Sequence, residues 1–338
     1  MRRRRKRRNR EQQQQQQHDP ATTLSLIGES LTKLPFQMLA EKGTQTLTHL
    51  ILYDNDLSAA EDTLLLVLGT LPSLLHLNLA SNGLSSSFLA GLLSVPAAPT
   101  LTSLDLSHNA LSGPLPRLLD SLSSLSSLRL NGNDVTALHP DERTEDAPAL
   151  SYLHLGASFT TRMGNGMSRT IQSALTSLPH AFLDSPSLAH VYLNNQQLRS
   201  LDPAGISSHC VALSKLIVSN NQLSHLPPVL ALLPSLTWLD ASKNIMTDLP
   251  LFLAHSSSLR RLSLVKNDFE DSKDRKFTNH HVNAQLLHFL RHHPDQQDAS
   301  DGAPDGPPSS DGPPSSSDDP SILSGAEADL PPLPPPYI

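Results

Sequence analysis

A leucine pattern that returns about every 25 residues constrains the fold of this chain more than any other feature. The template LxxLxLxxNxL can be laid on the sequence nine times in succession, starting at Leu47, Leu74, Leu101, Leu125, Leu150, Leu188, Leu213, Leu236 and Leu259. Successive starts are 27, 27, 24, 25, 38, 25, 23 and 23 residues apart. One such unit is too small to bury its own leucines. Neighbouring units must therefore stack and bury them mutually, which predicts a solenoid.

The ninth position of the template carries an amide side chain in most copies. An asparagine there can bond to backbone groups that are exposed where the chain bends. Leu24, Leu26 and Leu31 form a degenerate opening copy, with Glu29 at this position. Stacking of the copies should therefore bring the amides into a ladder along the solenoid. The nine stronger copies carry at this position Asn55, Asn82, Asn109, Asn133, Ser158, Gln196, Asn221, Asn244 and Asn267.

The LxL pair in each copy predicts a short strand whose alternate side chains face inward. Stacked copies should place these strands side by side in a parallel sheet. This pattern resembles the leucine-rich-repeat family over roughly residues 21–270. The resemblance implies an α/β solenoid, a leucine-rich-repeat horseshoe with a parallel concave sheet. The later copies are similar to the intracellular type of 23 residues, and the segment "LSGPLPRLLDSLSSL" from Leu111 is similar to the plant type. Both types imply short turns or short helices on the convex side.

The spacing of 38 residues marks an insertion after Ser158. It contains "TTRMGNGMSRT", with Arg162, Gly164, Gly166 and Arg169. A glycine-rich polar segment predicts a loop. It either overhangs the solenoid with a function of its own or is a neutral insertion, because long surface loops cost little extra closure entropy.

Residues 1–20 read MRRRRKRRNREQQQQQQHDP and predict a disordered basic and polyglutamine arm. The arm suits a nuclear-import signal, contact with RNA phosphates, or no specific partner. No aromatic residue lies between the basic ones to stack on bases, which weighs against RNA. The basic residues singled out in this arm are Arg2, Arg3, Arg4, Arg5, Lys6, Arg7 and Arg8.

Residues 294–338 predict a disordered acidic, proline-rich tail. The segment has twelve prolines, nine acidic residues and no basic one, so it cannot form a core. It ends in LPPLPPPYI, where Pro334, Pro335 and Tyr337 match the PPxY motif that WW domains bind. A proline-rich stretch is already close to polyproline II and loses little entropy on docking. The tail is therefore a candidate ligand for a WW-domain protein.

Between the repeats and the tail, residues 271–293 predict a capping helix. "HHVNAQLLHFLRHH" places Val282, Leu286, Phe289 and Leu290 on one helical stripe. A helix here would cover the open end of the sheet, which solenoids need. Its histidines suggest a metal site, but no carboxylate or cysteine nearby completes a ligand set, so we expect a solvated polar face and no metal.

The candidate binding residues are those that alternate with the buried leucines, because they should point outward from the concave sheet. All three tyrosines and the one tryptophan of the solenoid fall on such positions, whereas none of the eight phenylalanines does. Tyrosine and tryptophan are enriched at binding hot spots, although flat strand surfaces also favour aromatic residues. The residues predicted to bind a partner protein are Tyr53, His76, Tyr152, His154, His190, Tyr192, Trp238 and Arg261.

The sequence gives no support for an enzyme. It lacks the phosphate loop GxxxxGK[ST] and HExxH. Cys210 lies next to His209, but a neighbour in the sequence does not supply the oriented base that a nucleophile needs. One cysteine allows no internal disulfide, and no apolar run approaches the ~18 residues of a membrane span. We expect a soluble protein of the cytoplasm or nucleus with no cofactor.

Two functions remain open at this point. The first is a non-catalytic scaffold or adaptor that binds a protein on the concave face. The second is a nuclear protein that uses its arginine-rich arm to contact RNA or chromatin. Residues 21–293 carry 17 basic and 21 acidic residues, which makes nucleic acid an unlikely ligand for the solenoid itself.

Overall fold

The computed structural model describes residues 22–34, 43–157, 160–162, 168–170, 175–180, 182–202, 205–271, 273, 278 and 284–292. The predictions for the basic arm and for the acidic tail, including Pro334, Pro335 and Tyr337, lie outside the described residues. Ser158 also lies outside them.

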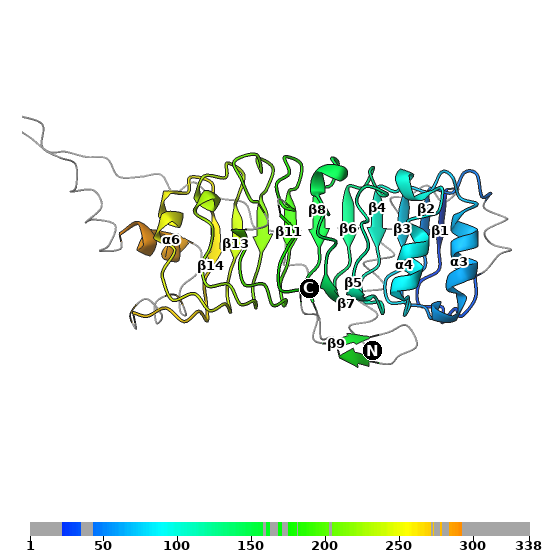
Figure 1. The fold of residues 1–338 in the computed structure, drawn as a ribbon, viewed down its shortest axis with the longest axis horizontal. Coiled ribbons are helices and arrows are strands. Elements are labelled where there is room, and N and C mark those ends of the chain that lie inside the picture. Colours follow the sequence, from blue (N-terminus) through cyan, green and yellow to red (C-terminus); the bar gives the residue numbers. More distant parts are fainter. Residues whose placement is uncertain are drawn as a thin grey trace, which may run out of the picture.

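A single sheet of 10 parallel strands runs along one side of the molecule (Figure 1). The central residue of each strand is buried and its neighbours are more exposed, as the LxL pattern predicts, except in Lys215–Ile217, where Ile217 is buried as well. The predicted solenoid with its parallel sheet is confirmed. In spatial order the strands are β1 (Thr23–Ser25), β2 (His49–Ile51), β3 (His76–Asn78), β4 (Ser103–Asp105), β6 (Ser127–Arg129), β8 (Tyr152–His154), β11 (His190–Tyr192), β12 (Lys215–Ile217), β13 (Trp238–Asp240) and β14 (Arg261–Ser263).

The strands pair without a shift in register. Leu50 of β2 lies opposite Leu77 of β3, and Leu77 lies opposite Leu104 of β4. The same pairing of template positions continues to Leu262 in β14. Residues at one template position therefore form a row that crosses the sheet, with neighbours about 4.8 Å apart. Outward-facing side chains from distant repeats are brought together in this way.

The predicted asparagine ladder is present where the structure describes it. Asn109 is typical. Its Nδ2 donates to the carbonyls of Leu106 and Leu79, both at 3.0 Å. Its Oδ1 accepts from the backbone N–H groups of Asn82 at 2.9 Å and Leu84 at 3.0 Å. The side chain is fully buried, so these bonds replace those that water would supply. Each ladder amide thus ties its own bend to that of the preceding repeat.

The residue before each ladder amide adopts a left-handed backbone conformation. Asp54, Ser81 and His108 have φ values of 60°, 58° and 57°, and Gly132 has 73°. Other residues hold this conformation at the equivalent position, but at Gly132 a Cβ atom would collide with the His108 ring, so glycine is favoured there for space. This recurring turn aims the following amide into the stack.

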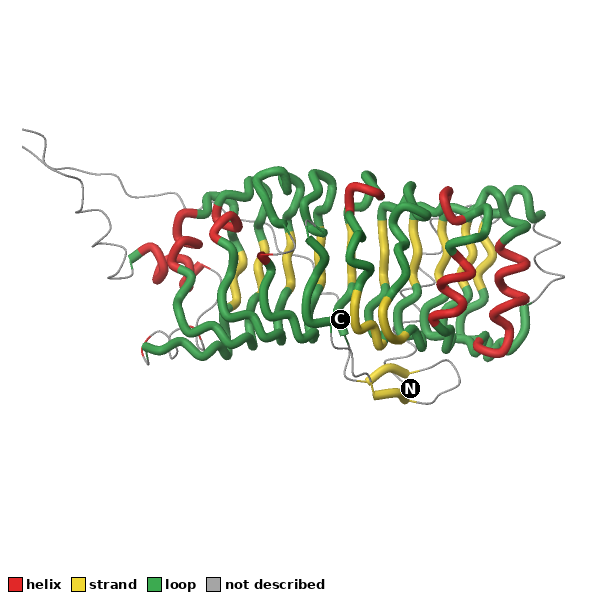
Figure 2. The backbone as a smooth tube through the Cα atoms, in the orientation of Figure 1, coloured by secondary structure: helices red, strands yellow, loops and turns green. Residues whose placement is uncertain are grey.

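The side opposite the sheet changes character along the chain (Figure 2). At one end the longer repeats form α3 (Glu61–Leu68) and α4 (Ser86–Leu92), and Ser85 Oγ caps α4 by accepting from the Phe88 N–H. The 23-residue repeats instead form short 3-10 helices, since their prolines interrupt the segment. These and the other 3-10 helices are η1 (Ser58–Ala60), η2 (Ala98–Thr100), η3 (Thr144–Asp146), η5 (Pro228–Ala231) and η6 (Leu251–His255).

Two further strands come from the plant-type segment and the repeat after it. β5 (Ser112–Pro114) pairs in parallel with β7 (Asp134–Ala137), separately from the main sheet. The register shifts between Gly113 and Pro114, where the proline has no N–H to donate.

The insertion after Ser158 differs from the prediction of a plain loop. β9 (Thr160–Arg162) and β10 (Ser168–Thr170) pair in an antiparallel sheet of their own. Figure 1 shows this pair beyond the ends of the main strands. The β-branched threonines at positions 160, 161 and 170 favour extended backbone, and the five residues between the strands are a length typical of hairpins. The sequence-based interpretation predicted a loop because it gave more weight to the glycine content than to these features.

Helix α6 (Ala284–Arg291) lies within the range where the sequence predicts a capping helix. It contacts η6 and β14, and Leu286 and Leu290 are fully buried. Arg291 donates through Nε to the Ala254 carbonyl at 3.2 Å. The last strand of the sheet is thereby covered. No helix among the described residues has both the length and the apolar character of a membrane span.

The ladder makes a stability prediction. Asn109→Ala should lower the free energy of unfolding by about 2–4 kcal/mol, because it leaves two buried N–H groups without an acceptor. Urea denaturation followed by circular dichroism measures this. The matched control is Asn131→Ala, whose half-buried amide makes one long contact with the His108 ring at 3.3 Å and should cost less than about 1 kcal/mol. Equal losses in the two variants would contradict the role of the ladder.

Candidate functional site

The outward positions of strands β6 to β14 hold a continuous group of rings and cations, here called the aromatic–cationic stripe. The register places Tyr152 of β8 opposite His190 of β11, and His190 opposite Lys215 of β12. Lys215 lies opposite Trp238 of β13, and Trp238 opposite Arg261 of β14. The members of the stripe are Arg129, Tyr152, His154, His190, Tyr192, Lys215, Trp238 and Arg261.

The rings of the stripe contact one another. The centroids of Tyr152 and Tyr192 are 5.4 Å apart, and those of His154 and Tyr192 are 4.9 Å apart. Tyr152 meets His190 edge to face at 6.2 Å. Such pairs fix each other's orientation and are worth about 0.5–1.5 kcal/mol beyond area burial. The four rings therefore form a largely preorganised surface in place of separately moving side chains.

Each cation of the stripe lies over an aromatic face. Lys215 Nζ is 3.5 Å from the Trp238 ring centroid and 4.9 Å from that of Tyr192. The Arg261 guanidinium, on the strand at the other side of Trp238, is 5.0 Å from the centroid of the Trp238 ring. The Arg129 guanidinium is 4.5 Å from the Tyr152 centroid. Cation–π contact holds these long side chains against the sheet without neutralising their charge.

No ion pair joins the three cations to a carboxylate within the part of the chain that the structure describes. Two acidic residues on the same face, Asp105 opposite Arg129 in the register and Asp240 of β13, bond within their own turns. Asp105 accepts from the N–H and hydroxyl of Ser107, and Asp240 does the same with Ser242. These carboxylates fix the bend after the strand, and the cations keep their charge available to a ligand.

Burial sets the protonation states of the stripe. It raises the pKa of Tyr152 and of Tyr192, so both phenols stay neutral and can donate a hydrogen bond. Burial, and after it the Arg129 charge, lower the pKa of His154 to about 4. Burial, then Arg261, lower the pKa of Lys215. At neutral pH the charge of the stripe therefore comes from Arg129, Lys215 and Arg261, not from histidine.

The structure brings together six of the eight residues predicted from the sequence and separates two. Tyr53 lies two residues beyond β2 and His76 lies in β3, where its ring stacks on that of His49 at a centroid distance of 4.2 Å. Strand β4 lies between β3 and β6, the first strand of the stripe. Tyr53 and His76 therefore share the face but not the stripe.

Two members of the stripe were missed as predicted site residues, namely Arg129 and Lys215. Both occupy outward positions of the template, so the alternation that identified Tyr152 and Trp238 applies to them equally. The search for hot-spot aromatic residues passed over them. A search for cations one strand away from an aromatic residue would have found both.

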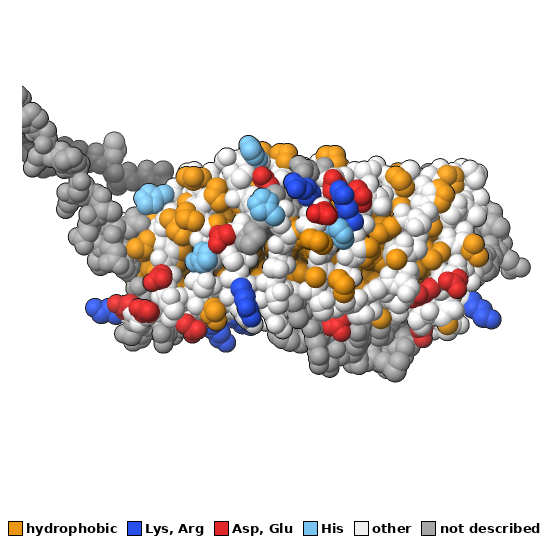
Figure 3. Space-filling model, viewed as in Figure 1, with side chains coloured by type: hydrophobic (Ala, Val, Ile, Leu, Met, Phe, Trp, Pro, Cys, Tyr) orange, Lys and Arg blue, Asp and Glu red, His pale blue; other side chains and the backbone are white. Residues whose placement is uncertain are grey.

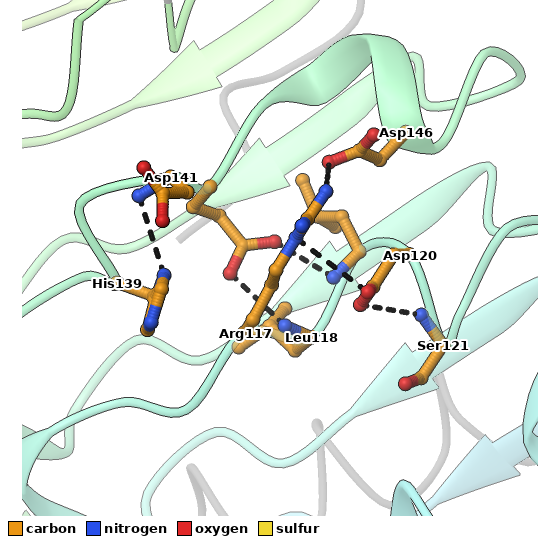
Figure 4. A network of polar contacts seen from close by, with 9 residues as sticks. Arg117, Leu118, Asp120, Ser121, His139, Asp141 and Asp146 are labelled. Atoms are coloured by element: carbon orange, nitrogen blue, oxygen red, sulfur yellow. Dashed lines mark hydrogen bonds and ion pairs between the residues drawn. The ribbon is translucent and has the colours of Figure 1, made fainter.

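A second polar cluster lies on the opposite side of the molecule. Figure 3 is drawn in the same view as Figure 1, with α3 and α4 toward the reader, and shows charged side chains gathered over the region of η3 and β8. Arg117 bonds to Asp146 at 2.8 Å and lies 3.5 Å from Asp120 (Figure 4). The buried Glu142 carboxylate accepts from the N–H groups of Leu118 and Leu119 at 2.9 and 2.7 Å. These charges already have partners that join two loops, so we assign this cluster to the structure of the convex side.

The other reactive residues form no site among the described residues. Cys210 is buried, burial raises the pKa of its thiol, and its Sγ lies 3.2 Å from the Leu183 carbonyl. His209 instead approaches Asp184 at 3.9 Å. The described part of the chain contains no group of three or more histidine, cysteine or acidic side chains that could hold a metal ion.

Comparison with known sequences agrees with the geometry. Residues 100–122 match the family model described as Leucine Rich Repeat. The chain is 32% identical over 164 residues to human Podocan-like protein 1, which covers 46% of this chain and 32% of that protein. The mouse protein of the same name is 30% identical over 164 residues, which cover 46% of this chain and 29% of that protein. The chain thus spans about a third of the length of these curated relatives.

Solved structures share the fold. A leucine-rich-repeat protein of Leptospira interrogans superposes with a TM-score of 0.52 at 26% identity, over 70% of this chain and 53% of that one. A chain from the octameric complex of Latrophilin 3, Unc5D and FLRT2 has a TM-score of 0.56 at 21% identity, and the match covers 78% of this chain and 76% of that one. The ectodomain of the Arabidopsis receptor kinase HAESA, solved with a peptide hormone, has a TM-score of 0.50 at 23% identity. The match covers 71% of this chain and 36% of that one.

The charge state of His154 makes a pH prediction. Its pKa is lower in the folded chain, about 4, than the ordinary value of 6.5, so the unfolded chain binds more protons between these values. The free energy of unfolding should therefore fall by roughly 2 kcal/mol more between pH 7 and pH 5 than it would without this group. Denaturation at both pH values in the chain and in His154→Gln measures the difference. An identical pH dependence in the two proteins would show that His154 is not shielded.

Proposed function

This chain is a leucine-rich-repeat protein, and we propose that it is a non-catalytic interaction scaffold that binds a protein ligand on its concave face through the aromatic–cationic stripe. Leucine-rich repeats are typically modules of protein interaction, and their curved sheets provide extended binding surfaces. The observation that carries the proposal is the gathering of aromatic rings and cations from six consecutive strands, β6 to β14, into one contacting group.

The composition of the stripe matches that of interface hot spots. Tryptophan, tyrosine and arginine dominate such positions because they combine a large contact area with a polar end. Here Tyr152, Tyr192, Trp238 and Arg261 are half-buried, so part of each side chain is already ordered and part remains open to a ligand. The contacts between neighbouring rings lower the entropy that a ligand must remove on binding. A protein segment that lies across the strands would meet these anchors in sequence.

The structural neighbours support a protein ligand for this fold. The ectodomain of HAESA is solved with a peptide hormone ligand, and a chain similar to this one occurs in the complex of Latrophilin 3, Unc5D and FLRT2. Their similarity to this chain is one of fold, so the identity of the ligand does not carry over. What supports the proposal is that this fold binds protein ligands in other molecules.

We further propose that the tail recruits a second protein, which would make the chain an adaptor. Pro334, Pro335 and Tyr337 form the PPxY pattern within a segment rich in proline. Prolines preset the polyproline II conformation that WW domains bind, and the tyrosine adds an aromatic anchor. The solenoid would then hold one protein while the tail presents a ligand for another.

The binding role of the stripe is tested with Tyr192→Ala/Trp238→Ala in the full chain. Proteins captured by the unchanged chain are identified by cross-linking and mass spectrometry, and the purified ligand is titrated by calorimetry. Loss of two hot-spot rings should weaken binding by about 4 kcal/mol, close to a thousandfold.

The matched control for this test is Tyr53→Ala/His76→Ala, which truncates two rings on the same face outside the stripe. Binding by this control should stay within about tenfold of the unchanged chain. Circular dichroism and urea denaturation establish that both variants are folded. A folded Tyr192→Ala/Trp238→Ala chain that keeps its affinity would refute the proposal.

The tail is tested by titrating the full chain into an isolated WW domain of the PPxY-binding class. Tyr337→Ala should weaken binding at least about tenfold, because it removes the one aromatic anchor of the motif. Pro313→Ala, a proline outside the motif, should bind as the unchanged chain does. Absence of binding by the unchanged chain, or equal binding by Tyr337→Ala, would remove the WW-ligand assignment.

A further inference from the structure

Among the described residues the cations of the stripe form no ion pair with a carboxylate, and two of them lie close to one another. Lys215 shares the Trp238 ring with Arg261, on opposite neighbouring strands. Like charges held this close repel, and the partly buried ammonium of Lys215 has lost some of its water. An anionic group placed over this row would relieve both costs. The stripe is thus suited to a ligand that brings carboxylates.

The rings of the stripe favour a ligand that is also rich in proline. Tyr152, Tyr192 and Trp238 present flat faces along the sheet, a type of surface on which proline-rich segments dock in their extended conformation. Such segments carry apolar pyrrolidine rings at short intervals and need little ordering. A ligand that alternates prolines with acidic residues would satisfy the rings and the cations together.

The chain itself contains a segment of this composition. Residues 294–338 carry nine acidic residues, twelve prolines and no basic residue. Seven of the acids lie between positions 295 and 319, interspersed with glycine, serine and proline. The charge and the rings of this tail complement those of the stripe, whereas the solenoid as a whole carries more acidic than basic residues.

The tail follows α6 in the sequence, and α6 packs on both η6 and β14 at the end of the solenoid where the stripe ends. Helix α6 contacts β14, the strand that carries Arg261 at the end of the stripe. Arg291, in the last turn of α6, is tied to the carbonyls of Ala254 and Ser256. The stripe crosses five strand spacings, about 24 Å, whereas 45 residues of polyproline II span about 140 Å. Length therefore does not limit docking.

We propose that the acidic proline-rich tail, residues 294–338, docks on the aromatic–cationic stripe of its own chain. Its carboxylates lie over Arg261, Lys215 and Arg129, and its prolines contact Trp238, Tyr192 and Tyr152. This inference rests on the proposed function, since it names the first occupant of the same face. A protein ligand must then displace the tail, so the tail sets a threshold for binding to the stripe.

The docking is weak because its charge contacts are exposed to solvent. Solvent-exposed pairs of opposite charge contribute little individually and are screened by salt. Attachment to the same chain offsets this, because a flexible link supplies an effective concentration in the millimolar range. The docked state therefore forms within one molecule and yields to a ligand with better contacts.

The chain offers a direct reporter of docking. Trp238 is the only tryptophan and lies within the stripe, and Cys210 is the only cysteine and is buried. Ser316→Cys in the full chain therefore provides one accessible thiol in the tail for an energy acceptor. Energy transfer from Trp238 to this acceptor, normalised to the unlabelled protein, measures how close the tail lies.

Docking predicts high transfer in this protein and about twofold lower transfer when all nine acids of the tail are changed to their amides. Lys215→Gln/Arg261→Gln should lower it similarly. The matched control, Lys33→Gln/Arg199→Gln, removes the same charge elsewhere and should not. Raising NaCl from about 0.1 M to about 1 M shortens the Debye length from about 10 Å to about 3 Å. At the higher salt the difference in transfer between the acidic tail and the amide tail should disappear.

Three outcomes would overturn the inference. Equal transfer with acidic and amide tails would show that charge does not hold the tail. Transfer that falls with the amide tail but not with Lys215→Gln/Arg261→Gln would place the tail on another cationic segment, such as the basic arm. Transfer that rises with protein concentration would place it on a second copy. In each case the loss of ligand by Tyr192→Ala/Trp238→Ala remains a separate test of the proposed function.

Discussion

The structure depends on one recurring arrangement, the buried amide that bonds to its own bend and to the bend before it. Asn109 shows the full set, with two carbonyl acceptors and two N–H donors. Because these bonds fix the offset between repeats, the strands pair without a shift in register. Register in turn decides which side chains meet on the outer surface of the sheet. The stripe is a consequence of the ladder, since its members come from repeats up to about 130 residues apart in the sequence.

The same geometry explains how the concave face of the sheet can become a binding surface. Short parallel strands leave their outward side chains about 4.8 Å from their neighbours, close enough for rings and cations to contact directly. Lys215 between Tyr192 and Trp238 is held in this way, without an acidic partner among the described residues. Contacts within the stripe order the side chains before a ligand arrives, while the charges stay available. Preorganisation of this kind favours binding more than additional area does.

Much of the fold could be predicted from the sequence, because its determinants are local and repeated. The leucine spacing predicted the strands, and the ninth position predicted the ladder, including Gln196, which donates to the Leu155 carbonyl at 2.6 Å. The site was predicted in part. Alternation identified Tyr152, Tyr192 and Trp238, but not which outward residues lie together. Arg129 was missed because the search favoured aromatic residues, and its contact with Tyr152 of the next repeat is visible only in the structure. The pairing of β9 with β10 was missed because glycine content was weighed above threonine's preference for strands.

The central claim is that a protein ligand lies across the stripe and not on the opposite side. A photoreactive phenylalanine analogue placed at Tyr192 of the full chain tests this directly, with the same analogue at the exposed Leu66 on the opposite side as its counterpart. After irradiation with the captured ligand, mass spectrometry locates the covalent products. The account predicts efficient cross-linking from position 192 and little from position 66. Cross-linking from position 66 with none from position 192 would contradict it.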